Sequence, residues 1–551
     1  MTTKRQPDGQ PEKPRIVDEL PRLGSAGSRS AQLHEQVGGT GVDPKQVKRI
    51  SVREMNRFSV LRLLGTVGAL LIGLGGLGAG ALPVVHNPFG LLPGGSLMAR
   101  MLQASSAVVL IGVALMVVAW VLMAPFVGAK KLNSGVTDST IMRTFLAWSL
   151  PLLFTAPLFT QDIYSYLAQG SIVAQGLDPY SAGPVNILGT EHHLARSVPF
   201  IWAHSPSPYG PVALGIAAAI SVITQDSIIL GVLAHRFVSL VCLLGASWAI
   251  AALARRCDVA PATALWLGIL NPLTILHLVG GIHNESILLG FMLIGVEVGL
   301  RGIDKLETAS KIPAWSFIIF SGVLITCAGL VKVTGFMALG FTGMAVARAI
   351  GGWKGLIQAV LVQVSLLVST TAVVSWITGI GLGWVTGQGG AATIRSWLSV
   401  STDIGVIFGF IGMLLGLGDH TDALLAVTRL VGVLIAIAFL LRMLWATYKG
   451  SIHPVGGLGV ATFVLVILFP VVHPWYMLWA ILPLAAWANR PFFRQAVVAY
   501  SAVFSFLVLP RGLALPASTV LTIYSSAIVA GIVLATLAIL WLRTNRVHQL
   551  T

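Results

Sequence analysis

Long apolar runs dominate this sequence and restrict what it can fold into. A bilayer core about 30 Å thick requires about 20 apolar residues in a helix. Fourteen runs reach or approach this length, and they lie at 58–82, 104–127, 140–158, 230–254, 260–280, 284–301, 313–330, 333–350, 355–378, 424–447, 455–472, 475–489, 495–510 and 518–543. Only 10% of the 551 residues are charged, whereas soluble domains have about a quarter. The sequence therefore predicts an all-α polytopic membrane protein with about fourteen spans.

The basic net charge of +15 does not indicate a nucleic-acid partner. Lys and Arg lie at the ends of apolar runs, where they orient membrane helices, and they form no single patch. The three cysteines, Cys242, Cys257 and Cys327, have no metal-ligand spacing, and a disulfide framework is not expected.

Residues 1–57 differ from the rest of the chain, because they are polar and rich in Pro, Gly and charge. Such a segment cannot bury enough apolar surface to fold alone, so we expect a disordered, basic cytoplasmic tail. Lys45, Arg49, Arg53 and Arg57 recur every four residues and would form one basic stripe on a helix. That stripe either lies on anionic lipid or serves only as a flank that orients the first span.

Two shorter runs, near 208–224 and 403–418, decide the topology. If both crossed the membrane, Arg255, Arg256, Arg301, Lys305 and Lys311 would lie outside, against the positive-inside tendency. If both are re-entrant or peripheral, both chain ends are cytoplasmic, and 28 of the 35 Lys and Arg residues lie inside. We adopt the second arrangement, in which residues 58–551 form one transmembrane domain.

Seven cations then remain on the extracytoplasmic side, where a charge at the edge of a span usually has a partner or a ligand. They are Arg100, Arg196, Arg236, Lys332, Arg395, Arg429 and Arg511. The largest loop, 159–207, lies on the same side. Polar chemistry is therefore expected at the outer face.

That loop contains the most informative motif of the chain. It opens with Thr-Gln-Asp-Ile-Tyr-Ser-Tyr-Leu-Ala-Gln-Gly at 160–170, which places Asp162 at the outer end of a span. Leu-Asp-Pro-Tyr follows at 177–180, and Ser-Pro-Tyr-Gly-Pro at 207–211 leads back to the membrane. Three later outer-face clusters are His-Asn-Glu at 283–285, Lys332 between two apolar runs, and His-Pro-Trp-Tyr at 473–476.

In this order of motifs the chain resembles the GT-C glycosyltransferases, polytopic enzymes that use sugars linked to polyprenyl phosphate. The resemblance extends over most of residues 140–490 and implies a GT-C-like helix bundle whose extracytoplasmic loops form the active site. Within the superfamily, the chain is most similar to the actinobacterial α-1,6-mannopyranosyltransferases of lipomannan synthesis, and among them to the B-type. An acidic residue at the start of the first large loop is the catalytic base of such enzymes, and Asp162 matches it.

The resemblance implies a polyprenyl phosphomannose donor, an inverting transfer, and a phosphatidylinositol mannoside or mannan acceptor in the plasma membrane. The residues expected at the donor are Lys332, Arg236, His283, Glu285, His473 and Tyr476. Those expected at the acceptor are Tyr164, Tyr166, Glu191, His192 and Tyr209. Neither a metal nor another cofactor is expected, because the donor carries a single phosphate.

Other interpretations remain open at this stage. A flippase or transporter of lipid-linked glycans would carry ionisable residues at mid-bilayer, and His277 alone approaches that position. Within the enzyme class, an arabinosyl or glucosyl donor is the alternative. Asp162 could merely cap a helix, Lys332 could form a structural ion pair, Glu191 and His192 could lie in an exposed loop, and His473 to Tyr476 could belong to an aromatic belt.

Overall fold

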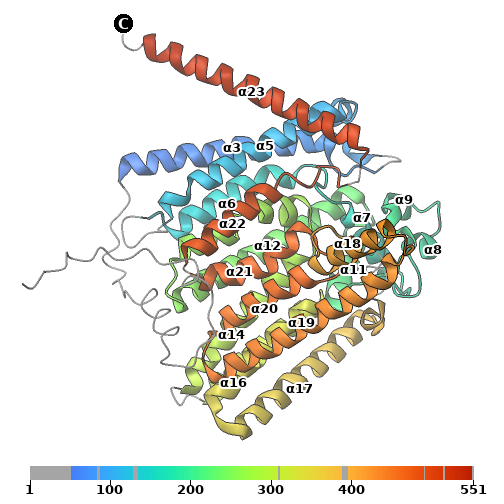
Figure 1. Ribbon diagram of the computed structural model, residues 1–551, viewed down its shortest axis with the longest axis vertical. Helices are drawn as coiled ribbons and strands as arrows, with labels where there is room; N and C mark the ends of the chain where they lie inside the picture. The colour runs from blue at the N-terminus through green and yellow to red at the C-terminus, as the bar shows by residue number, and fades with distance from the viewer. Residues whose placement is uncertain are drawn as a thin grey trace, which may run out of the picture.

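The computed structural model describes residues 51–83, 87–127, 135–307, 311–387, 395–488, 490–512 and 515–548, and within these ranges it contains helices and no strands. Nine of the described helices are long and apolar enough to cross a membrane. They are α3 (Val52–Ala79), α5 (Leu102–Leu122), α12 (Ile228–Arg256), α14 (Glu285–Glu307), α15 (Lys311–Gly329), α16 (Met337–Ile350) with the 3-10 turn before it, α17 (Gly352–Thr378), α19 (Thr421–Lys449) and α23 (Ala517–His548). The predicted all-α, multi-pass architecture is confirmed (Figure 1).

The other five predicted runs also fold into helices, but into shorter ones. They are α6 (Asp138–Leu153), α13 (Pro261–Gly268) with a π-helical segment (Thr274–Gly280), α20 (Pro454–Leu468), α21 (Leu478–Trp487) and α22 (Pro491–Phe504). Proline begins three of them, α13, α20 and α22, and lies inside α6 and α21. Because proline lacks an amide hydrogen and restricts the residue before it, it ends or bends helices that hydropathy alone would extend.

The first span begins earlier than expected. Ser51 accepts a hydrogen bond from the Glu54 amide while the Glu54 carboxylate accepts one from the Ser51 amide, so a capping box starts α3 at Val52. Residues 52–57 are therefore helical, which corrects the prediction of a disordered segment up to residue 57. The rest of the predicted tail, with Lys45 and Arg49, lies outside the described residues.

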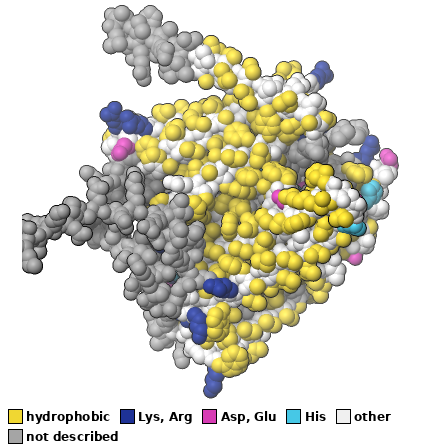
Figure 2. All heavy atoms as spheres, viewed as in Figure 1, with side chains coloured by type: hydrophobic (Ala, Val, Ile, Leu, Met, Phe, Trp, Pro, Cys, Tyr) yellow, Lys and Arg dark blue, Asp and Glu magenta, His cyan; other side chains and the backbone are white. Residues whose placement is uncertain are grey.

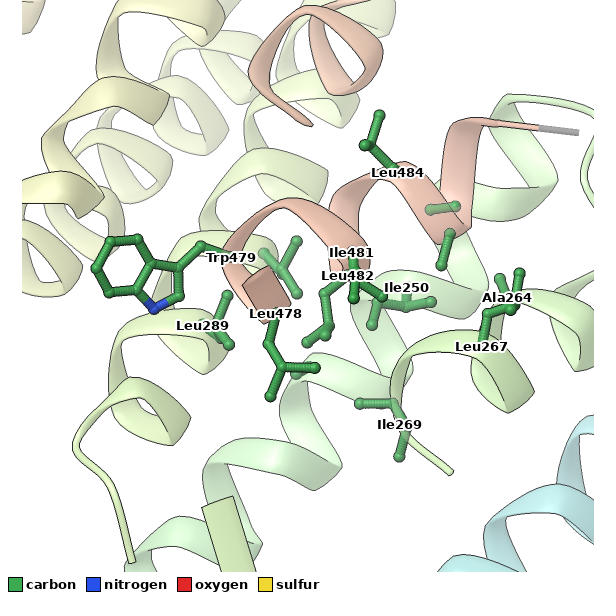
Figure 3. Close-up of a cluster of buried hydrophobic side chains, with 14 of the residues drawn as sticks. Ile250, Ala264, Leu267, Ile269, Leu289, Leu478, Trp479, Ile481, Leu482 and Leu484 are labelled. Atoms are coloured by element: carbon green, nitrogen blue, oxygen red, sulfur yellow. The ribbon is translucent and has the colours of Figure 1, made fainter. Parts of the chain in front are cut away.

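Small residues allow the helices to pack closely. A Cβ atom added to Gly68 of α3 would lie 2.6 Å from the carbonyl oxygen of Gly112 in α5. A Cβ atom added to Gly112 would likewise lie 2.6 Å from the carbonyl oxygen of Gly68. Lipid tails are as apolar as leucine, so such contact is a main source of stability between membrane helices. Figure 3 shows the apolar centre, where Leu482 of α21 lies close to Ile250 of α12.

Short helices gather at one end of the bundle (Figure 1). They are α7 (Asp162–Ala174), α8 (Pro184–Leu188), α9 (His193–Ser197), α10 (Phe200–Ala203), α11 (Pro211–Thr224) and α18 (Val400–Leu414). The start of α11 packs on Leu330, just beyond α15, and Gly215 faces Thr378, the last residue of α17. Asp226, which follows α11, accepts a hydrogen bond from Ser171 of α7. These contacts keep both ends of α11 at the same end of the bundle.

The surface agrees with a membrane location. Hydrophobic side chains cover most of the side of the bundle in Figure 2, and the few charged and histidine side chains gather mainly near its ends. At the end away from α7, Arg256 lies 2.7 Å from the buried Glu297 and 2.6 Å from the exposed Asp304, so the buried carboxylate is paired. The chain is a multi-pass membrane protein, and the end of the bundle that carries α7 holds the predicted polar motifs.

Candidate active site

The backbone before Asp162 is held in an unusual turn. The Leu158 amide donates to the Gly280 carbonyl (3.1 Å) and the Phe159 amide donates to the Pro510 carbonyl (2.7 Å). Phe159 has a φ of +64°, a left-handed conformation that a bulky residue rarely adopts. Such strain persists only where neighbouring contacts fix the backbone, and it is common at functional sites. The turn makes Asp162 the first residue of α7.

The carboxylate of Asp162 has two close neighbours. The indole N–H of Trp202, from α10, donates a hydrogen bond to Oδ1 (2.9 Å), and Nδ1 of His283 lies 3.6 Å from Oδ2. The Asp162 side chain is 25% exposed, so it remains reachable. Burial raises the pKa of Asp162 above its usual range, and the hydrogen bond from Trp202 opposes that rise. A reachable carboxylate with a raised pKa suits a general base.

The second element of the site is a lysine–glutamate pair. Nζ of Lys332 lies 2.8 Å from Oε1 of Glu285, 4.0 Å from the ring centroid of Tyr476 and 4.7 Å from that of Trp479. Burial acts against the charge of Lys332, but the Glu285 carboxylate outweighs this effect, and the pKa of Lys332 lies above its usual range. The lysine is therefore a permanent cation, held by one carboxylate and two aromatic faces.

An aromatic stack joins these two elements. The ring of Trp475 lies 4.1 Å from the ring of His283 and 4.6 Å from that of His473, centroid to centroid. Burial lowers the pKa of His473 to about 4 and the pKa of His283 well below its usual range, so both are neutral at pH 7. Because His283 contacts Asp162 and lies two residues before Glu285, the stack fixes the carboxylate beside the lysine–glutamate pair.

Two predicted acceptor residues lie nearby. The hydroxyls of Tyr166 and Tyr209 are 3.2 Å apart, and the Tyr180 hydroxyl donates to the Tyr209 carbonyl (2.8 Å). The next residue must be glycine, because a Cβ atom at Gly210 would lie 2.2 Å from the carbonyl oxygen of Leu330. This close approach brings the Tyr-Gly-Pro turn against the segment that carries Lys332.

Two other predicted residues face away from the site. Arg236 is 1% exposed and was expected to face outward, but its guanidinium donates to the carbonyls of Leu153, Thr155, Ala156 and Gly280. It fixes the chain before Asp162 and before His283, so its role is structural. Tyr164 is likewise 1% exposed, and its hydroxyl donates to the Ala81 carbonyl instead of facing an acceptor.

Glu191 and His192 lie at the far end of α7 from Asp162. The Glu191 side chain is 92% exposed and lies 3.6 Å from Arg196. His192 stacks on His193, whose Nε2 contacts the carbonyl of Asp226 (3.0 Å). Asp226 in turn bonds the C-terminal half of α7, so these two residues belong to an exposed loop and the structure does not bring them to Asp162.

Sequence reasoning missed Trp202 and Trp479. The only signal for Trp202 is an isolated tryptophan in a polar loop, 40 residues from the carboxylate that it contacts. Among the residues that the structure describes, no group of three or more His, Cys, Asp or Glu could hold a metal ion.

These observations define a class of protein: a multi-pass helical membrane protein with a partly exposed carboxylate and a paired lysine at one end of its bundle. A family model for the N-terminal domain of alpha-(1->6)-mannopyranosyltransferases matches residues 62–348, and the MptB C-terminal domain matches residues 401–536. The chain belongs to this mannosyltransferase family.

Individual relatives support the B-type. The chain is 61% identical over 538 residues to alpha-(1->6)-mannopyranosyltransferase B of Corynebacterium glutamicum, covering 93% of this chain and 89% of that protein. Identity is 41% with a probable alpha-(1->6)-mannopyranosyltransferase of Mycolicibacterium smegmatis, covering 88% and 87%. It is 32% with the A enzyme of Mycobacterium tuberculosis, covering 81% and 83%.

One solved structure overlaps partly. Archaeal oligosaccharyltransferase AglB from Archaeoglobus fulgidus, in complex with an inhibitory peptide and a dolichol-phosphate, has 12% sequence identity and a TM-score of 0.39. The overlap covers 71% of this chain and 56% of AglB. An overlap this weak supports no conclusion about the site.

Proposed function

We propose that this protein transfers mannose from polyprenyl phosphomannose to a mannolipid, forming α-1,6 linkages during synthesis of the lipomannan and lipoarabinomannan core. The reaction takes place at the extracytoplasmic face of the plasma membrane, and both chain ends are cytoplasmic. Family membership supports the mannosyl transfer. The observation that carries the proposal is the Asp162 carboxylate, which is hydrogen-bonded by Trp202 and joined through His283 to the Glu285–Lys332 pair.

The transfer is a single displacement. The acceptor's 6-hydroxyl oxygen bonds to the anomeric carbon of the mannosyl group as the bond from that carbon to the phosphate oxygen breaks. The electron pair of the broken bond leaves with the phosphate, and the hydroxyl proton passes to Asp162. A β-linked donor thus gives an α-linked product, because attack and departure occur on opposite faces of the sugar.

The departing phosphate needs stabilisation of its negative charge more than it needs a proton. Lys332 supplies a permanent positive charge, and its ammonium has three donors, of which one bonds Glu285. A phosphate that takes the remaining donors forms charge-assisted hydrogen bonds, which are the strong class. The aromatic faces of Tyr476 and Trp479 keep the ammonium in place. The proposal requires no metal or other cofactor.

The acceptor sugar is assigned to the side of Asp162 that carries Tyr166 and Tyr209. Their paired hydroxyls offer both a donor and an acceptor to a sugar, and their rings meet edge to face 5.2 Å apart. Tyr209 is partly exposed, whereas Tyr166 is 3% exposed. Tyr209 therefore makes the contact, and Tyr166 orients its hydroxyl.

Asp162→Asn tests the proposal directly. Membranes that contain this variant, supplied with radiolabelled polyprenyl phosphomannose and a mannolipid acceptor, should show no transfer although the protein accumulates normally. Asp178→Asn is the matched control, because Asp178 lies in the same loop and its side chain accepts a backbone hydrogen bond from Tyr180, which the asparagine side chain also accepts. Full activity of Asp162→Asn would show that Asp162 is not the base. If the unmodified protein transferred label only from an arabinosyl or glucosyl donor, the mannose assignment would be wrong.

A further inference from the structure

An apolar groove runs along the side of the bundle between α16 and α17. Its volume is about 240 Å³, and its walls include Phe336, Gly343, Val360 and Val364. Val360 is 47% exposed and Val364 is 51% exposed, so the groove opens toward the surrounding bilayer. The stem of Gln363 closes its floor, because a Cβ atom at Gly343 would lie 3.0 Å from Cγ of Gln363.

The groove is long and narrow. Its wall on α17 extends from Leu356 to Leu367, which at 1.5 Å per residue is about 16 Å. All of its lining residues except Gln363 are apolar or glycine. These dimensions and this chemistry fit an extended hydrocarbon chain and exclude a sugar.

One end of the groove reaches the site described above. Phe336 ends the 3-10 turn Val333–Phe336, which begins immediately after Lys332. Its ring lies 5.9 Å from that of Trp384, next to Gly383. A Cβ atom at Gly383 would lie 2.5 Å from the ring of Tyr180.

The contacts continue from there into the acceptor side of the site, because the Tyr180 hydroxyl donates to the carbonyl of Tyr209 (2.8 Å). The segments that carry Phe336, Trp384 and Tyr180 therefore link the end of the groove to the site that contains Lys332.

We propose that this groove binds the polyprenyl chain of the donor while the donor phosphate lies at Lys332. This inference rests on the proposed function. In a polyprenyl phosphosugar the phosphate is bonded directly to the first carbon of the chain, so the chain must begin within a few bonds of the cation. An acceptor mannolipid carries sugars between its reacting hydroxyl and its acyl chains, so its chains are not restricted in this way.

The groove acts through shape and not through hydrophobicity. A chain that moves from the bilayer into the groove loses no contact with water, because both surroundings are apolar, so the net gain comes from close packing. The branched, unsaturated polyprenyl chain must therefore fit better than the acyl chains of ordinary lipids. Gln363 is 8% exposed, and its Oε1 atom has no hydrogen-bond partner. A hydrocarbon chain in the groove offers no donor to this atom.

Val364→Trp tests the inference by filling the groove. Leu361→Trp is the matched control, because Leu361 lies on the same helix, is 62% exposed and does not line the groove. Each variant is assayed with two mannosyl phosphate donors, one with a natural long polyprenyl chain and one with a chain of one or two isoprene units. We expect Val364→Trp to raise KM for the long donor about tenfold, which corresponds to ~1.4 kcal/mol, with kcat and the kinetics of the short donor unchanged.

Other results separate the possible failures. An unchanged KM for the long donor would mean that bilayer lipid occupies the groove, and an equal rise for both donors would mean that the variant distorts the site near Lys332; either result overturns the inference. Failure of the unmodified protein to use either donor would instead refute the proposed function. If Val364→Trp does not accumulate, Val360→Phe takes its place.

Discussion

The hydrogen bond from Trp202 to Asp162 gives the most quantitative test of the site. Trp202→Phe removes the single donor of the indole and keeps an aromatic ring of similar position. The hydrogen bond stabilises the ionised carboxylate, so its loss raises the pKa of Asp162 further above its usual range. Because a general base acts only when it is deprotonated, the variant should lose activity at a higher pH than the unmodified protein does.

The size of the effect follows from the geometry. A hydrogen bond to a charged group contributes about 1.5–3 kcal/mol. The Asp162 side chain is 25% exposed, so water replaces part of the lost hydrogen bond, and we take the lower limit of that range. Since 1.36 kcal/mol corresponds to one pKa unit, the acid limb of the kcat/KM profile should move up by about one pH unit.

The assay is mannosyl transfer in membranes across the pH range, with donor far below KM. Trp353→Phe is the control, because Trp353 is 72% exposed and lies at the start of α17, whereas the last residue of α17, Thr378, contacts α11. The activities of Trp202→Phe and the unmodified protein should converge at high pH. An acid limb that does not move, or an equal loss of activity at every pH, would refute the view that Trp202 sets the protonation of Asp162.

Two further predictions concern the cation and the turn beside it. Lys332→Met should raise KM for the donor at least tenfold through loss of about 1.4 kcal/mol or more of phosphate binding, as measured by donor saturation; a change confined to acceptor saturation would contradict the phosphate role. Gly210→Ala should lower both thermal stability and activity, because its Cβ atom would lie 2.2 Å from the Leu330 carbonyl oxygen, and a thermal-shift assay of detergent-purified protein measures this. Gly90→Ala, whose Cβ atom meets nothing within 4 Å, should change neither.

The sequence predicted the helices well and their lengths less well. Hydropathy located all nine described helices that are long enough to span, because burial in lipid requires continuous apolar residues, but it did not mark the short helices of the loop 159–207. It did not show that the run 260–280 divides into α13 and a π-helical segment, since apolar residues continue on both sides of Asn271 and Pro272. The early start of α3 was readable from Ser51 and Glu54, but the polar composition of the tail obscured it.

The site was predictable where polar residues interrupt apolar sequence. Asp162, Glu285 and Lys332 stand out in this way, and the structure brings all three segments together. Arg236 stands out equally, yet its partners are backbone carbonyls that no side-chain pattern reveals. Trp202 reaches Asp162 only through the folding of the loop, so neither periodicity nor charge could identify it.

The buried guanidinium of Arg236 also constrains how the protein is assembled. An arginine inside a membrane helix costs ~2.5–3.5 kcal/mol when it enters the bilayer without partners. Three of its acceptors, the carbonyls of Leu153, Thr155 and Ala156, precede it in the chain and are synthesised first, whereas Gly280 emerges later. The carbonyls at and just after the end of α6 therefore offset this cost, and because α6 is synthesised before α12, these acceptors are already present when Arg236 enters the bilayer.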